Sequence, residues 1–388
     1  MDESTAHRVH RPGAPHEPGP DCCAGHDPAA GPAFVVGSLE AVARAAGGPT
    51  EEGTRRRTRD LLRHGADAIS SAATVDVHAH PGAFHRPRTG ELPLAALDEM
   101  RVGGVDAACF AISTDGPVIH RYPGGGIRQS REPVAGQLYR DTVMRLERVL
   151  VRAREGRVQL VLAPADLGAI RACGVPGALI AFEGADALEG DLARVEEFHR
   201  LGVRSIQLVH YRINELGDIQ TEAARHGGLT AFGAAVVGEM NRLRMVVDGA
   251  HASPDTLRGI LAASRHPVMV SHTGPAALRP DVRRHLPDDL LREVAAGGGL
   301  IGIWPHTRTA AGVEQLVAEV EYVRRLVGSD HVAIGTDMAG LTTFTSMPTY
   351  REFAPLPAAF LAHGFTEPDV RKVLGGNFAR LLAEVALG

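Results

Sequence analysis

The sequence has no long hydrophobic run and no apolar stretch near its beginning. Its apolar runs fall well short of the ~20 residues that a membrane-spanning helix needs, and the opening segment MDESTAHRVHRPG lacks the hydrophobic stretch of a secretory signal. It has four cysteines, of which Cys22 and Cys23 are adjacent, so their spacing does not predict a disulfide framework. We therefore expect a protein of the reducing cytoplasm with no membrane partner.

Basic clusters are also scarce. With 41 basic and 46 acidic residues the formal net charge is −5, and the run RRR at 55–57 stands alone. This pattern argues against nucleic acid as a partner. What the chain does have is size and apolar content, since 388 residues, 44% of them hydrophobic, can bury a large core.

The first part of the chain differs from the rest in composition. Residues 1–35 are rich in proline, glycine and histidine and lack a periodic apolar pattern, which predicts a disordered tail. Residues 37–70 favour two helical pieces separated by Gly47, Gly48 and Pro49. We expect residues 36–388 to form a single domain.

Apolar, β-branched runs recur along this domain, and each is followed by a polar stretch of helical character. They fall at residues 75–80, 107–113, 179–183, 205–210, 245–251, 268–272, 300–304 and 332–337. Apolar strands alternating with helices are typical of a parallel sheet covered by helices. Eight of them favour a closed (β/α)8 barrel of the TIM type over a doubly wound sheet, and no GxGxxG follows the first strand. A further run at 158–162 is interpreted as an approach segment outside the barrel.

Polar side chains gather at the ends of these runs. In chain order they are His78 and His80, Ser113, Glu183, His210, His251, His272, Trp304 with His306, and Asp337. In a barrel the carboxyl ends of all strands lie on one face, where active sites are built. Histidines scattered through a core would rarely fall at five of eight strand ends, so the pattern predicts a site on that face.

The first run, TVDVHAHPG at 74–82, carries a pair of histidines, His78 and His80. Side chains alternate across a strand, so both imidazoles point the same way, about 7 Å apart along the backbone. Two imidazoles placed in this way can bind one metal ion from one direction. The alternative is a pair of core or surface histidines, and the polar residues at the other strand ends argue against it.

Imidazoles and carboxylates together are ligands for zinc and other first-row divalent ions. The candidate ligands are His78, His80, Glu183, His251 and His272. They exceed what one tetrahedral ion needs and suit two ions, about 3.5–4 Å apart, bridged by Glu183 and by a water whose pKa falls towards ~7. Asp337 would pass the proton of that water to the leaving group, and His210 would polarise the substrate carbonyl or stabilise the oxyanion. The set predicts metal-assisted hydrolysis.

Several sequence blocks together resemble the membrane (renal) dipeptidase family of the amidohydrolase superfamily. They are IAFEG at 180–184, VRSIQLVHYRINELGD at 203–218, GLTAFG at 228–233, MNRLRMVVDGAH at 240–251, HPVMVSHT at 266–273, RRHLPDD at 283–289, LVGSDHVAIGTDMAG at 326–340 and VLGGNFARLL at 373–382. The resemblance runs from about residue 55 to the C-terminus. It implies a zinc-dependent hydrolase of dipeptides on a (β/α)8 barrel, often a homodimer.

The resemblance also implies a role for individual residues. Glu183 matches the carboxylate that bridges the two metals, and His78 matches one ligand of the first ion. The ligands of the second ion are matched by His251 and His272. The substrate histidine and the strand-eight aspartate are matched by His210 and Asp337. Arg284 falls on the arginine that binds the dipeptide's terminal carboxylate, a role that suits a planar guanidinium, although a solvated position on the side of a helix stays open for it.

One position departs from the family pattern. The family usually has His-x-Asp after strand one, whereas this chain has His78-Ala79-His80, which replaces an anionic ligand by a neutral one. The leading hypothesis is a metal-dependent hydrolase of dipeptides or related small amides. The alternatives are a barrel recruited to other metal-dependent chemistry on an amino-acid-derived small molecule, and an inactive binding protein. Two loops, 116–126 and 342–357, are long enough to shape the pocket.

Overall fold

The computed structural model describes residues 51–86, 90–122, 126–307, 313–341 and 344–387. All of these residues belong to one compact unit. The expected disordered tail and the first of the two expected helical pieces lie outside the described residues. The second piece is helix α2, Glu51–Ile69.

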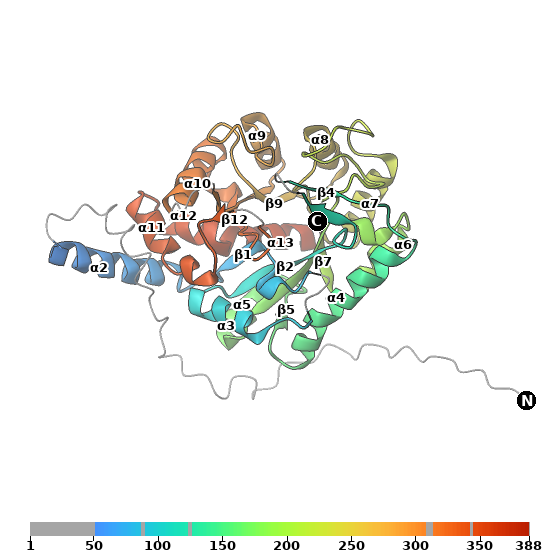
Figure 1. Ribbon diagram of the computed structural model, residues 1–388. Coiled ribbons are helices and arrows are strands. Elements are labelled where there is room, and N and C mark those ends of the chain that lie inside the picture. Colours follow the sequence, from blue (N-terminus) through green and yellow to red (C-terminus); the bar gives the residue numbers. More distant parts are fainter. Residues whose placement is uncertain (1–50, 87–89, 123–125, 308–312, 342–343, 388) are drawn as a thin grey trace, which may run out of the picture. The chain divides into compact units, whose positions relative to one another are not determined.

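Eight parallel strands form the core of this unit and pair in chain order (Figure 1). They are β1 (Val75–Ala79), β2 (Ala107–Ser113), β6 (Gly177–Glu183), β7 (Val203–Gln207), β8 (Val246–Asp248), β9 (Met269–Thr273), β10 (Leu300–Ile303) and β12 (Val332–Ile334). Each overlaps one of the runs selected from the sequence. A parallel bridge between Ala79 and Met338 joins the two ends of the sheet. The predicted (β/α)8 barrel is therefore confirmed, as a nearly closed barrel.

Most of the helices connect consecutive strands and lie on the outside of the barrel (Figure 1). After α2 they are α3 (Leu94–Gly103), α4 (Gln137–Arg154), α5 (Asp166–Cys173), α6 (Ala193–Arg200), α7 (Ala231–Arg242), α8 (Pro254–Ala263), α9 (Asp288–Ala296), α10 (Val313–Val327), α11 (Leu356–Ala362), α12 (Glu367–Arg371) and α13 (Asn377–Leu387). Several begin at hydroxyl caps, such as Thr230 for α7 and Ser253, followed by Pro254, for α8. No helix among the described residues is both long and apolar enough to cross a membrane.

Shorter strands lie outside the barrel path. The segment at 158–162 contains β5 (Gln159–Leu160), which pairs with the first two residues of β6, whereas β7 pairs with β6 from Ile180 onward. The prediction that this segment is not one of the eight barrel strands is confirmed, although it does form a short strand. Two small antiparallel pairs are β3 (Ile119–Arg121) with β4 (Ile127–Gln129), and β11 (His306–Thr307) with β13 (Phe344–Thr345).

The interior of the barrel is apolar at the end where the strands begin. Inward-facing residues of the strands, among them Val75, Leu179 and Ala181, pack there against Phe378 and Leu381 of α13. Because side chains alternate along a strand, Glu183 is the next inward-facing residue of β6 after Ala181. The apolar end therefore gives way to a polar end within one strand.

Candidate active site

Glu183 is the side chain at the centre of the polar end of the barrel. It is 3% exposed, and the hydroxyl of Ser113, at the end of the neighbouring strand β2, donates a hydrogen bond of 2.7 Å to its Oε2. Histidines from four other strand ends surround this carboxylate. Four of these histidines, His78, His80, His251 and His272, fall into two groups that share Glu183.

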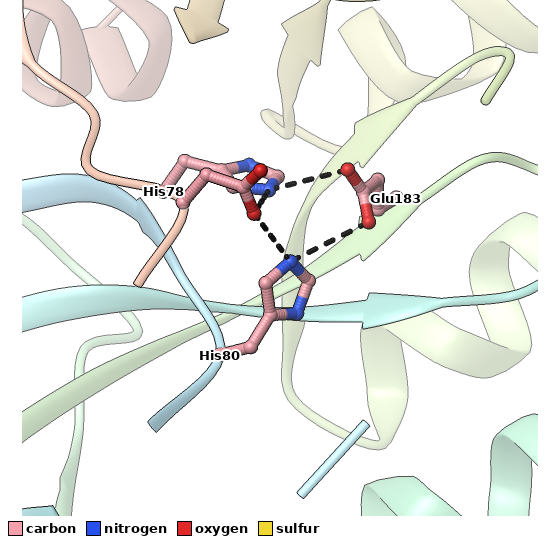
Figure 2. A group of neighbouring side chains, drawn as sticks. His78, His80 and Glu183 are labelled. Atoms are coloured by element: carbon pink, nitrogen blue, oxygen red, sulfur yellow. Dashed lines mark ion pairs between the residues drawn. The ribbon is translucent and has the colours of Figure 1, made fainter. Parts of the chain in front are cut away.

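The first group contains His78, His80 and Asp337 beside Glu183. Figure 2 shows the rings of His78 and His80 and the carboxylate of Glu183 pointing toward one another. Nε2 of His78 is 3.4 Å from Oε1 of Glu183, and Nε2 of His80 is 3.5 Å from its Oε2. Asp337 Oδ1 lies 3.2 Å from Nε2 of His80. Because Nδ1 of His80 donates to the carbonyl oxygen of Ala111 at 2.7 Å, Nε2 is the nitrogen that faces the group.

A β-bulge in β1 aims this histidine pair. The register of β1 against β2 shifts between Asp76 and Ala79, so that Val77 packs in the apolar interior and the next residue, His78, also points inward. The buried Asp76 carboxylate holds the bulge by accepting hydrogen bonds from the backbone N–H groups of His78 and Thr336. The same connection brings Asp337, which follows β12, next to His78, whose carbonyl oxygen accepts from the Asp337 N–H at 2.9 Å.

The second group contains His251 and His272 beside the same carboxylate. Their Nε2 atoms are 3.3 Å and 3.7 Å from Oε1 of Glu183 and 3.0 Å from each other. The hydroxyl of Ser271 lies between the groups, 3.2 Å from Nδ1 of His78 and 3.0 Å from Nδ1 of His272. The backbone of His251 has φ +63° and that of Asp337 has φ +50°, a left-handed conformation that costs free energy and is common at functional sites.

The two groups fit divalent cations. Nε2 of His78 and Oδ1 of Asp337 are buried without a hydrogen bond to any described residue. Buried donors and acceptors are rarely left in this state, and imidazole nitrogens facing carboxylate oxygens are the ligand set of zinc and related metals. The structure therefore brings together all five predicted metal ligands and adds Asp337 to the first group.

The electrostatics of the site follow from burial and charge. Burial alone would raise the pKa of Glu183, but His210 and His251 hold it well below its usual value. Burial would lower the pKa of His210, but the carboxylates of Asp115 and Glu183 raise it to about 10. For His251, burial and the Arg284 guanidinium both lower the pKa, well below the usual value. The Glu183 carboxylate at the centre is thus ionised, and imidazole nitrogens surround it.

Two predicted substrate-binding residues line the same cavity. His210 follows β7, and its Nε2 is 3.3 Å from Oε1 of Glu183. Arg284 is 5% exposed, so the alternative of a solvated arginine is wrong. Its Nη2 donates to the carbonyl oxygen of His272 at 3.4 Å, whereas Nε and Nη1 have no hydrogen bond to any described residue. The guanidinium carbon lies 5.3 Å from the centre of the Trp304 ring, a cation–π contact that helps to hold the group in place. Nε and Nη1 are therefore available to a ligand in the cavity.

The cavity in front of these groups has a volume of about 650 Å³, which suits a small molecule. Loop 116–126 contributes to its wall as predicted, through Gly116, Ile119 and Arg121. For loop 342–357, residues 342–343 lie outside the described part, and the described remainder does not line the cavity. His85, Arg145 and Tyr211 are among the lining residues that were not predicted from the sequence.

The sequence of residues 88–387 matches the model of one protein family, described as Membrane dipeptidase (Peptidase family M19). The chain belongs to the membrane dipeptidase family. The resemblance drawn from the sequence blocks is therefore confirmed.

Relatives and solved structures of the membrane dipeptidase family agree with this assignment. Dipeptidase aclJ of Aspergillus oryzae is 34% identical over 216 residues, which cover 53% of this chain and 51% of the relative. Dipeptidase tcpJ of Claviceps purpurea is 33% identical over 257 residues, which cover 63% of this chain and 60% of the relative. The chain thus spans between half and two thirds of these two relatives. The crystal structure of dipeptidase AC, a metallopeptidase, superimposes with a TM-score of 0.69 at 25% identity and covers 81% of this chain and 98% of that chain.

Proposed function

We propose that this protein is a metal-dependent dipeptidase. The observation that supports this most strongly is the position of Glu183, which faces two histidine groups at once and opens on a cavity that also contains Arg284. The named relatives are dipeptidases, and none of them favours the recruited barrel or the inactive binding protein.

The two groups would hold two divalent ions, with zinc as the expected metal. His78, His80 and Asp337 would bind one ion and His251 and His272 the other, with Glu183 as a ligand of both. Ions bound there supply a water of lowered pKa and polarise the carbonyl of the scissile bond.

Substrate binding, stabilisation of the oxyanion and proton transfer would be carried out by side chains of the protein. Arg284 would bind the C-terminal carboxylate of the dipeptide through Nε and Nη1, which are the donors left without a partner. Nε2 of His210 faces the cavity, where it would stabilise the negative charge that develops on the carbonyl oxygen. The Asp337 carboxylate would accept the proton of the attacking water and deliver it to the amide nitrogen as the C–N bond breaks.

A panel of substrates tests this proposal. Purified protein loaded with zinc is assayed with L,L- and L,D-dipeptides, and with the same dipeptides as C-terminal amides. We expect hydrolysis of dipeptides with a free carboxylate, and a loss of about a hundredfold or more when a chelator removes the metal. Full hydrolysis by metal-free protein, or no hydrolysis of any dipeptide by loaded protein, would overturn the proposal.

Two further expectations stay predictions. The resemblance implies a homodimer, which light scattering on the purified full chain would detect. The composition predicts a cytoplasmic location, which fractionation of cells that produce the untagged chain would check.

A further inference from the structure

The imidazole of His210 lies between two carboxylates. Its Nε2 faces Glu183 at 3.3 Å, and its Nδ1 is 2.7 Å from Oδ1 of Asp115. The second oxygen of Asp115 accepts the backbone N–H of Tyr211, the next residue, at 3.0 Å. One carboxylate therefore contacts both the ring of His210 and the backbone that carries it.

The Asp115 carboxylate is buried, and its main side-chain partner is His210. Its exposed fraction is 0%, and burying a carboxylate costs several kcal/mol unless it is paired. In the described part of the chain, the imidazole of His210 is the only side chain that forms an ion pair with it. The nearby Arg145 instead pairs with Asp141 and donates to the carbonyl oxygen of Ser113.

Asp115 is the last of three consecutive residues that each hold part of the site. Ser113 donates to Glu183, and Thr114 Oγ1 donates to the carbonyl oxygen of Gly184 at 2.8 Å. These contacts fix the end of β2 to the end of β6. The segment therefore places the Asp115 carboxylate at a defined distance from Glu183, with the ring of His210 between them.

We propose that Asp115 is a positioning residue, which acts on the substrate only through His210. Its Oδ1 accepts the Nδ1–H of the ring and fixes the ring plane, so that Nε2 is the nitrogen directed at the cavity. This inference rests on the proposed function for its kinetic consequences, but the Asp115–His210 contact itself is independent of the reaction.

The kinetic test compares Asp115→Ala, Asp115→Asn, His210→Ala and the double variant Asp115→Ala/His210→Ala in the zinc-loaded full chain. Asp115→Ala should lower kcat by about 10- to 100-fold with little change in KM, as for other residues that orient a ligand or catalytic group from behind. Asp115→Asn should recover part of the loss, because an amide oxygen still accepts from Nδ1–H. The double variant should be no slower than His210→Ala, since Asp115 has no effect once the ring is gone.

Asp106→Asn is the matched control. This residue lies immediately before the first residue of β2, at the opposite end from Asp115, and pairs with Arg171 at 2.7 Å, away from the cavity. It should leave kcat, KM and bound zinc unchanged. A double variant that is slower than His210→Ala by the full factor of Asp115→Ala, or Asp115→Ala with wild-type kcat, would overturn the proposal.

A second measurement keeps the test independent of activity. In protein labelled with ¹⁵N-histidine, the Nδ1–H of His210 should give a low-field proton signal that is absent in His210→Ala. We expect Asp115→Ala to abolish or strongly shift this signal while the melting temperature and metal content stay close to wild type. An unchanged signal in Asp115→Ala would refute the inference even if the protein proves to be a dipeptidase. If the wild type is inactive but Asp115→Ala still abolishes or shifts the signal, only the proposed function is refuted.

Discussion

The two groups that share Glu183 differ in charge. The first, with His78 and His80, contains a second carboxylate, Asp337, whereas the second, with His251 and His272, has no carboxylate besides Glu183. The pKa of His78 is raised, because Glu183 and Asp337 outweigh the effect of burial. The pKa of His272 is instead well below the usual value, because burial, His78 and Arg284 all oppose its positive form.

Because of this difference in charge, the two groups that share Glu183 should differ in their affinity for a cation. The first group is anionic and lies where the barrel closes, so it should bind a cation tightly. The second lies beside Arg284, so it should bind a cation less tightly, close to the group expected to hold the substrate. We therefore expect the first group to fill at a lower metal concentration than the second.

The largest expected effect is that of removing the shared carboxylate. Glu183→Gln should lower kcat/KM by about a thousandfold, because both ions lose a ligand and each contributes several kcal/mol. Bound metal, measured by mass spectrometry, should fall at both groups. Glu239→Gln on α7, where the carboxylate pairs with Arg242, is the control and should behave as wild type. If only one ion is lost from Glu183→Gln, the carboxylate is not shared.

The next change separates substrate binding from metal binding at the second group. Arg284→Ala should weaken productive binding of dipeptides by about 2–5 kcal/mol, as for other buried charge pairs. Dipeptide amides should be nearly indifferent to the change, and zinc affinity of the second group should not fall, since a repelling charge is removed. Equal losses on both kinds of substrate would show that Arg284 acts on the fold or on the metals.

The strands were predictable because parallel strands buried on both faces are apolar along their length. The predicted run 107–113 coincides with β2, but the run 245–251 contains only a short strand, Val246–Asp248. His251 lies beyond the strand end with φ +63°, a conformation that cannot be predicted from the residue type. The strand ends were therefore located to within a few residues, which was enough to place the site.

The candidate ligands could be selected from their positions at the strand ends, but the residues that hold them in place could not. The contact between Asp115 and His210 joins residues 95 positions apart, so local sequence does not show it. One signal was present, since Asp115 follows Ser113 with the spacing that separates His78 from His80. The β1 bulge and the place of Ser271 between the groups likewise depend on pairing between distant strands.

A smaller effect is expected at His80, where the sequence resemblance leads us to expect an aspartate. His80→Asp would give the first group a third carboxylate and sharpen its contrast with the second. The added negative charge should tighten the first ion and raise the pKa of water at the site, which moves the activity–pH profile upward. Chelator competition and pH–rate profiles measure these changes. Equal metal content and kinetics in wild type and variant at every pH would show that His80 is not a ligand.

The smallest effect is expected from the hydroxyl between the groups. Ser271→Ala removes the contacts with Nδ1 of His78 and of His272, so both groups should bind zinc about tenfold more weakly. Ser205→Ala, which removes a buried hydroxyl bonded to the carbonyl oxygen of Val246, is the control. A change in zinc affinity at one group alone would mean that Ser271 supports that group and does not link the two.

Zinc titration of the metal-free protein, followed by calorimetry and by dipeptidase activity in the same samples, tests the two-group site most directly. We predict two binding steps per chain, with the tighter step assigned to the first group because it is lost in His78→Ala, and the weaker step lost in His251→Ala. Dipeptidase activity should rise as the second step fills. Full activity in metal-free protein, or a single zinc step that neither variant alters, would contradict this account.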